Sequence, residues 1–216
     1  MARRNHLAGI RAHAAALCAF VSLLGWAGCS RGPAAIPPVN VDVDRVVEQL
    51  LSEYDKDQSG GLSPEELSVS PPLAQSLSGF RQDQDDEISA QRLTKELHRI
   101  FDPQSALVSA SCVVKRNGQP LSGAEVRFVP LPVLQDELPV GSGATDSDGT
   151  AMISPPREEL PAEAPNVPLM PPGLYLVEIT HPTVTIPEKY NSKTILGKEV
   201  SSESVYRGGL AIDLKL

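Results

Sequence analysis

The residues best suited to chemistry lie between positions 55 and 66, where the sequence reads D-K-D-Q-S-G-G-L-S-P-E-E. Asp55, Asp57 and Glu66 bring three carboxylates into this short segment, and Ser59 and Ser63 add hydroxyl groups. Hard oxygen ligands of this kind favour calcium over zinc or copper. Three carboxylates around one divalent ion leave about one unit of negative charge. The segment therefore predicts a calcium site.

The same segment resembles the EF-hand calcium-binding loop. In that family the ligands come from positions 1, 3, 5, 7, 9 and 12, and a glycine at position 6 permits a sharp turn. The resemblance places Gly60 at the turn and implies these ligands: Asp55, Asp57, Ser59, the carbonyl of Gly61, Ser63 through a water, and both carboxylate oxygens of Glu66. Leu62, at position 8, is expected to point away from the ion and toward an apolar residue of a paired loop.

The end of this segment also has the features of a helix start. Ser63 is a favourable N-cap, Pro64 fits the first helical position, and Glu66 follows the cap by three residues. The alternative interpretation is an acidic, solvated turn between two helices, which D-x-D-x-S-G alone would often be. Agreement at positions 1, 3, 5, 6, 8, 9 and 12, with apolar-periodic segments on both sides, favours ion binding.

Helices are expected to hold the loop from both sides. Apolar residues recur at helical spacing before it: Val43, Val46, Val47, Leu50, Leu51 and Tyr54. After Glu66 the exiting helix is expected to be short, because Ser70-Pro71-Pro72 interrupts it and caps a new helix. The new helix carries Leu73, Leu77 and Phe80.

A second, degenerate loop is predicted at residues 81–92. Aligning Ile88 with Leu62 places oxygen-bearing side chains at positions 3, 5 and 9, which are Asp83, Asp85 and Ser89. The ends and the turn depart from the family, since positions 1, 12 and 6 hold Arg81, Arg92 and Asp86. Two cations at ligand positions repel an ion, so this loop is expected to pair Ile88 with Leu62 while binding calcium weakly or not at all.

A helix is expected to follow the second loop and to close an EF-hand pair spanning residues 40–103. Its apolar face holds Leu93, Leu97, Ile100 and Phe101, and Asp102-Pro103 ends it. His98 lies off that face and is interpreted as a solvated residue rather than a ligand.

The first 28 residues resemble a bacterial lipoprotein signal peptide. Three arginines precede an apolar run, Ala14 to Trp26, that is too short to span a membrane comfortably. Ala27-Gly28-Cys29 then implies Cys29 as the lipidated first residue, anchored to the membrane through a tether at 29–39. Trp26 departs from the aliphatic residue preferred there, so ordinary secretion with cleavage nearby and an uncleaved anchor stay open.

Charge and cysteine usage narrow the choice of partners. The formal net charge is −8, and removing the three arginines of residues 1–28, which include no acidic residue, lowers it to −11. A surface this acidic argues against nucleic acid and anionic lipid. With Cys18 in the signal and Cys29 lipidated, Cys112 is left alone and is expected to be a small core residue rather than a nucleophile.

From residue 106 the pattern changes from helical to alternating. Val108, Ala110, Cys112 and Val114 share one strand face, and Asn117-Gly118 marks a tight hairpin. Further strands are expected at 126–130, 141–145, 152–153, 173–179, 195–200 and 210–216. About seven short strands joined by turn-rich loops predict an antiparallel sandwich, and hence an α+β chain with a helical part followed by a β part.

The stretches V-K-R-N-G-Q-P-L-S-G-A-E-V-R-F-V-P, A-T-D-S-D-G-T-A, P-P-G-L-Y-L-V-E-I and I-P-E-K-Y-N resemble the carboxypeptidase-regulatory-like domain. This resemblance is closest to versions on planctomycete-type lipoproteins. It implies a prealbumin-like, seven-stranded sandwich over residues 106–216 in an extracellular setting, and it implies no chemistry. Asp146 and Asp148 lie in an Asp-Gly turn of the kind favoured for backbone reasons, so no metal is expected there.

The leading hypothesis is an exported, lipid-anchored calcium-binding protein without catalytic residues, at the periplasm or cell surface. One alternative is a calcium-dependent docking module of the dockerin kind, although those loops end in aspartate and occur as near-duplicates. Another is an enzyme resembling the hydroxyisourate hydrolases, whose Y-R-G-S tail is similar to Tyr206-Arg207-Gly208-Gly209. Here a whole strand follows that tetrapeptide, so no small-molecule substrate is expected.

Overall fold

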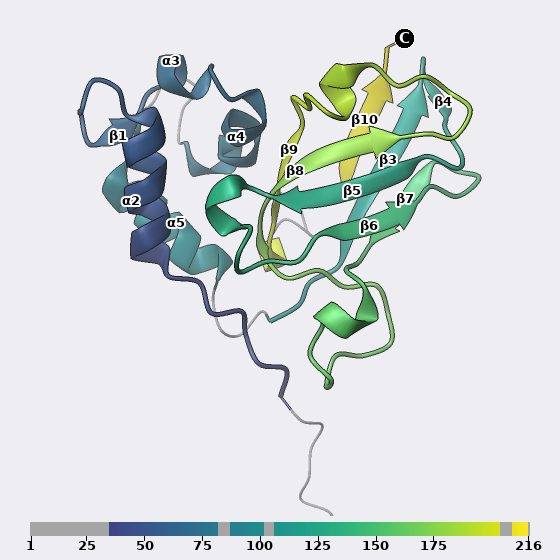
Figure 1. Cartoon of the computed structure of the whole chain (residues 1–216), viewed down its shortest axis with the longest axis horizontal. Coiled ribbons are helices and arrows are strands. Elements are labelled where there is room, and N and C mark those ends of the chain that lie inside the picture. Colours follow the sequence, from purple (N-terminus) through teal and green to yellow (C-terminus); the bar gives the residue numbers. More distant parts are fainter. Residues whose placement is uncertain (1–34, 82–86, 102–105, 204–208, 216) are drawn as a thin grey trace, which may run out of the picture. The chain divides into compact units, whose positions relative to one another are not determined.

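The computed structural model describes residues 35–81, 87–101, 106–203 and 209–215. Residues Ile36–Leu216 form one compact unit. Several predicted features lie outside the described residues: the signal peptide, the lipidation site Cys29, and Asp83 and Asp85 of the second loop. Of the tetrapeptide that starts at Tyr206, only Gly209 is described. The chain is a mixed α+β protein with a helical region, residues 43–101, followed by a β region, residues 108–214 (Figure 1).

The helical region begins with α2 (Val43–Tyr54), which Asp42 caps by accepting a hydrogen bond from the Arg45 N–H at 3.1 Å. A short α3 (Pro64–Leu67), α4 (Pro71–Ser76), the 3-10 helix η1 (Ser78–Phe80) and α5 (Ala90–Ile100) follow. The apolar stripes of α2 and α5 are buried at most positions, as their spacing predicted, but Leu51, Tyr54 and Phe101 are only partly buried. Ser70 is the N-cap of α4, as predicted, although its side chain makes no capping hydrogen bond. The helix ends at Ser76, so Phe80, which was expected on it, lies in η1.

The two loops of the helical region meet through a small antiparallel pair. Strand β1 (Gly61–Leu62) pairs with β2 (Ile88–Ser89), and the register places Leu62 opposite Ile88. Both side chains are buried. The predicted contact between the position-8 residues is therefore confirmed.

The β region contains two four-stranded sheets, an arrangement compatible with a β-sandwich (Figure 1). In the first sheet β3 (Ala110–Arg116) has β10 (Leu210–Leu214) on one side, and it pairs with β4 (Gln119–Pro120) and β7 (Thr150–Ile153). The second sheet has the order β6-β5-β8-β9, with bounds Gly141–Ala144, Glu125–Pro130, Gly173–Thr180 and Gly197–Val200. The remaining 3-10 helices are η2 (Pro132–Leu134), η3 (Arg157–Glu159) and η4 (Glu188–Tyr190).

The β region departs from the expected antiparallel, seven-stranded pattern in three ways. Strands β3 and β10 pair in parallel, because the chain reaches β10 from β9 of the other sheet and not through a hairpin. The described residues contain eight strands here, of which β4 has two residues, so the number seven is not confirmed. The strand expected from Ile195 begins at Gly197, and the Ile195 side chain is exposed.

The hairpin predicted at Asn117-Gly118 is confirmed. Both residues have positive φ, 50° and 82°, and Arg116 pairs with Gln119 across the turn. This is the backbone that a two-residue hairpin requires, and asparagine and glycine adopt it at low cost.

One hydrophobic core extends through the helical region and the β region. Cys112 lies within it with no exposed surface, on the β3 face shared with Ala110 and Val114. Burial raises the pKa of the Cys112 thiol to about 12. The thiol is therefore protonated and inaccessible at neutral pH, as expected for a core residue and not for a nucleophile.

Candidate metal centre

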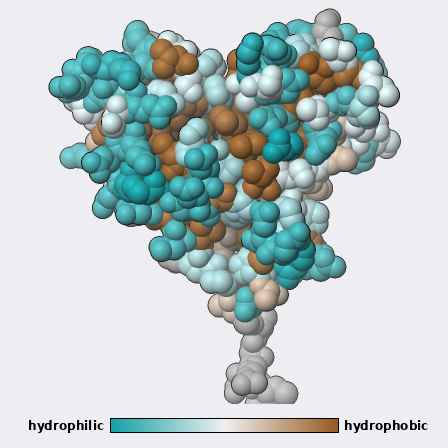
Figure 2. Space-filling view, in the orientation of Figure 1, coloured by the Kyte–Doolittle hydropathy of each residue, from teal (hydrophilic) through white to brown (hydrophobic). Residues whose placement is uncertain are grey.

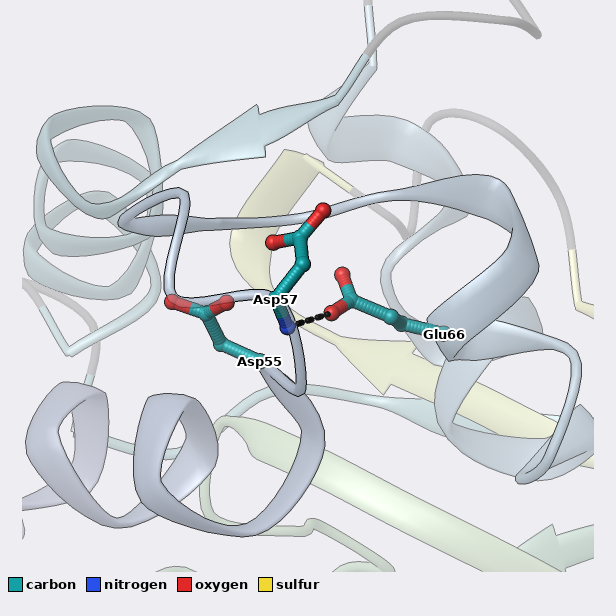
Figure 3. Close-up of side chains that lie close together, drawn as sticks. All are labelled: Asp55, Asp57 and Glu66. Atoms are coloured by element: carbon teal, nitrogen blue, oxygen red, sulfur yellow. Dashed lines mark hydrogen bonds between the residues drawn. The ribbon is translucent and has the colours of Figure 1, made fainter.

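Three carboxylates converge where the loop between α2 and α3 closes (Figure 3). Asp55 is the C-cap of α2, Asp57 lies in the loop, and Glu66 is in the first turn of α3. One carboxylate oxygen from each of the three lies within 4.8 Å of the others. Oxygens that share a calcium ion at 2.3–2.6 Å can be at most about 5 Å apart, so these three fit a single ion.

The backbone of the loop turns the two aspartates inward. The Asp55 carboxylate accepts hydrogen bonds from the N–H groups of Ser59 at 3.1 Å and Gly60 at 2.9 Å. The Ser59 N–H also donates to Asp57 Oδ1 at 3.0 Å. Gly60 has φ +86°, as predicted for the turn, and Gln58 also has a positive φ, 59°. The turn therefore requires a glycine at position 6, and the left-handed Gln58 was not foreseen.

Glu66 joins the start of the loop to its end. Its Oε1 accepts from the Lys56 N–H at 2.6 Å and the Asp57 N–H at 3.4 Å, the second of which is drawn in Figure 3. Its Oε2 accepts from the Ser63 N–H at 2.9 Å and the Ser63 hydroxyl at 2.8 Å. The Ser63 backbone bond, the Ser63 hydroxyl and the Lys56 backbone bond lower the pKa of Glu66 to about 2. The carboxylate is thus ionised at neutral pH.

Ser63 forms the predicted capping box with Glu66. Its hydroxyl accepts from the Glu66 N–H at 3.3 Å, while the Glu66 carboxylate accepts from the Ser63 N–H. The two residues that start α3 are therefore also two of the residues predicted to hold the ion. The water-mediated ligand role of Ser63 and the carbonyl ligand role of Gly61 stay predictions.

Glu87 reaches the loop from the second loop and was missed by the sequence reasoning. Its Oε1 accepts a hydrogen bond from the Ser59 hydroxyl at 2.9 Å. A Cβ on Gly61 would lie 2.0 Å from the same oxygen, so a glycine there leaves room for this carboxylate. Its position beside Ile88 was the available signal, since the pairing of Ile88 with Leu62 brings the second loop against the first.

The second loop is described at Arg81 and from Glu87 onward. Ser89 is the N-cap of α5 and accepts from the Arg92 N–H at 3.3 Å, so it has a structural role. The Arg92 side chain pairs with Glu96 on the next turn of the same helix at 3.1 Å. The weak calcium affinity expected of this loop stays a prediction.

The other candidate sites have structural explanations. Asp146 Oδ1 accepts from the N–H groups of Asp148 and Thr150, both at 2.9 Å, which explains the acidic turn. His98 lies on α5 with an exposed side chain, consistent with the solvated residue expected there. Within the described residues, Asp55, Asp57 and Glu66 are the one group of three His, Cys, Asp or Glu side chains close enough to share an ion.

The surface over the loop is accessible to solvent. Lys56, Asp57, Gln58 and Ser59 are exposed, and the loop between α2 and α3 presents hydrophilic residues in Figure 2. An ion can therefore reach the three carboxylates without rearrangement of the core.

No family model, no curated protein and no solved structure matches this chain. In the part of the chain that the structure describes, none of the helices combines the length and apolar character needed to cross a bilayer.

Proposed function

We propose that this protein binds one calcium ion in the loop 55–66 and that the ion has a structural, non-catalytic role at the cell envelope. The observation that carries the proposal is the convergence of Asp55, Asp57 and Glu66 within 4.8 Å. Three carboxylates this close repel one another. The hydrogen bonds that they accept from backbone N–H groups offset only part of that repulsion. A divalent cation with hard-ligand preference removes the rest.

The finer fold assignment belongs to the same proposal. The helical region is an EF-hand pair with one functional and one degenerate loop, supported by Gly60 at the turn and by the Leu62–Ile88 pairing. The β region is a prealbumin-like sandwich of the carboxypeptidase-regulatory-like kind, supported by two four-stranded sheets that share a core. Residues 1–28 direct export, and lipid on Cys29 holds the folded part at the membrane.

An exported location favours a structural role over a signalling role. Extracellular modules of this type bind calcium with Kd values of roughly 10⁻⁴ to 10⁻³ M, and such sites stay filled where calcium is plentiful. Calcium that binds only the folded form stabilises it by RT ln(1 + [Ca]/Kd), about 1.4 kcal/mol at about ten times Kd.

The test is the melting temperature of the protein with and without calcium. At about ten times Kd the stabilisation is expected to raise the melting temperature by about 3–6 °C. Asp57→Asn replaces a charged ligand by a neutral one of the same shape and should remove most of this rise. Asp148→Asn is the matched control, because it makes the same change in an acidic turn outside the metal centre.

A calcium-dependent rise that is lost in Asp57→Asn and kept in Asp148→Asn supports the proposal. An equal rise in the wild type and in Asp57→Asn would mean that calcium acts elsewhere, and no rise in any of the three proteins would leave the segment as a capped acidic turn.

A further inference from the structure

Within the described residues, three groups of contacts join the helical region to the β region, and the first is on α2. The Arg45 guanidinium pairs with the Glu137 carboxylate and donates to the Val133 carbonyl at 3.3 Å. Both acceptors belong to the segment around η2, which follows β5. The helix that enters the calcium loop is thus attached to the β5 side of the second sheet.

The second attachment is on α4, which covers the edge strand β9. The Gly197 N–H donates to Gln75 Oε1 at 2.8 Å, in place of a bond to a further strand. The Ser76 hydroxyl donates to the Pro72 carbonyl of its own helix at 2.9 Å and lies 3.4 Å from the Tyr175 carbonyl of β8. A Cβ on Gly197 would lie 1.8 Å from the Pro72 carbonyl oxygen, so helix and strand approach as closely as a glycine permits.

The third attachment is a charged network between α5 and β9. The Arg99 guanidinium donates to Glu199 at 3.0 Å and to Glu96 at 2.7 Å. Both carboxylates belong to residues that are only 8% exposed. Breaking such a network leaves charges in a partly desolvated position, which is costly. The Arg99 contacts therefore resist separation of the two regions.

The calcium loop lies between two of these attachments. It follows α2, which is attached beside β5, and it precedes α3 and α4, of which α4 is attached to β9. In the sheet order β6-β5-β8-β9, strand β8 lies between those two points. The segment from α2 to α4 therefore links the η2 segment after β5 to the edge strand β9, and α2 and α3 meet where the carboxylates of Asp55 and Glu66 converge.

We propose that the helical region is a strap, a segment bound to the second sheet at separate points, and that the loop 55–66 holds its two parts together. Calcium binding then stabilises the β region as well as the helices. This inference rests on the proposed calcium site for its ligand and on the three attachments for its coupling. Openings of the β region that release the strap also release the ion. Calcium therefore reduces their population by the factor 1 + [Ca]/Kd, about tenfold at about ten times Kd.

Cys112 provides a probe of such openings, because it is fully buried in β3, outside the helical region. The full chain in mild urea is treated with a thiol-alkylating reagent, and labelling of the peptide containing Cys112 is followed by mass spectrometry with calcium or with chelator. Arg99→Gln weakens the strap at β9. Arg127→Gln is the matched control, since Arg127 pairs with Glu178 at 2.9 Å across β5 and β8 without reaching the helical region.

Calcium should slow Cys112 labelling about tenfold in the wild type and in Arg127→Gln. Arg99→Gln should be labelled about tenfold faster than Arg127→Gln in chelator, and calcium should protect it less. Arg45→Gln, at the α2 attachment, should show the same faster Cys112 labelling and the same weaker protection by calcium as Arg99→Gln.

Two results would contradict the coupling between the helical region and the β region, and each can be told apart from failure of the calcium site. If the wild type binds calcium in a titration but its Cys112 labelling is unchanged, the site stands and the coupling is wrong. If no calcium binds, the proposed function fails, but the labelling rates in chelator still test the coupling between the helical region and the β region. Equal labelling of Cys112 in Arg99→Gln and Arg127→Gln would contradict that coupling.

Discussion

Replacing Gly149 by alanine is expected to destabilise the protein by about 2–5 kcal/mol. Gly149 has φ +74°, and a Cβ there would lie 2.4 Å from the Val114 carbonyl oxygen in the backbone of β3. The left-handed backbone costs an L-residue about 1–2 kcal/mol, and the forced shift of a packed strand costs about 1–3 kcal/mol more. The free energy of unfolding, from urea titration followed by circular dichroism, measures the loss.

Gly118→Ala separates the two causes. Gly118 has a similar φ, +82°, but a Cβ there would meet nothing within 4 Å. This variant should therefore show only the conformational cost, about 1–2 kcal/mol. Equal destabilisation by the two substitutions would contradict the close approach of the turn at Gly149 to β3.

Replacing Glu66 by alanine is expected to have the largest effect on calcium binding. The substitution removes both oxygens at position 12 and the bonds that join Lys56 and Ser63 across the loop. Two charge-assisted contacts, each worth about a factor of ten or more, predict an affinity at least about 100-fold lower. Calorimetric titration with calcium measures the change.

Glu65→Ala is the control for that substitution. Glu65 is the neighbouring carboxylate in the first turn of the same short helix, and it is exposed. Its removal takes away the same charge near the loop but no predicted ligand. If Glu65→Ala weakened calcium binding as much as Glu66→Ala, the effect would come from general electrostatic attraction and not from coordination at position 12.

Local signals in the sequence predicted the helical region and the convergence of Asp55, Asp57 and Glu66 well. The capping box, the glycine at position 6 and the pairing of Leu62 with Ile88 depend on residues close in sequence or on a fixed loop register. The Asn117-Gly118 hairpin is local in the same sense. Such features follow from backbone preferences and hydrogen-bond geometry, which a sequence carries directly.

Long-range contacts were not predictable from the same signals. Glu137 pairs with Arg45, and Gln75 binds the edge strand β9. In both cases the partners are far apart in sequence, and no local pattern identifies one from the other. The parallel pairing of β10 with β3 depends on which sheet the chain enters after β9, and strand alternation does not specify this. At Ser70 the residue type predicted the start of α4, but it did not fix the side-chain orientation, since no capping hydrogen bond forms.

Calcium titration calorimetry on the purified protein distinguishes an ion site from an acidic turn. One site with a Kd of roughly 10⁻⁴ to 10⁻³ M is expected, lost in Glu66→Ala and kept in Glu65→Ala. Two sites of similar affinity would show that the second loop was misinterpreted. No binding in the millimolar range would contradict the account, because the cluster of Asp55, Asp57 and Glu66 would then be an acidic turn closed by its own backbone hydrogen bonds.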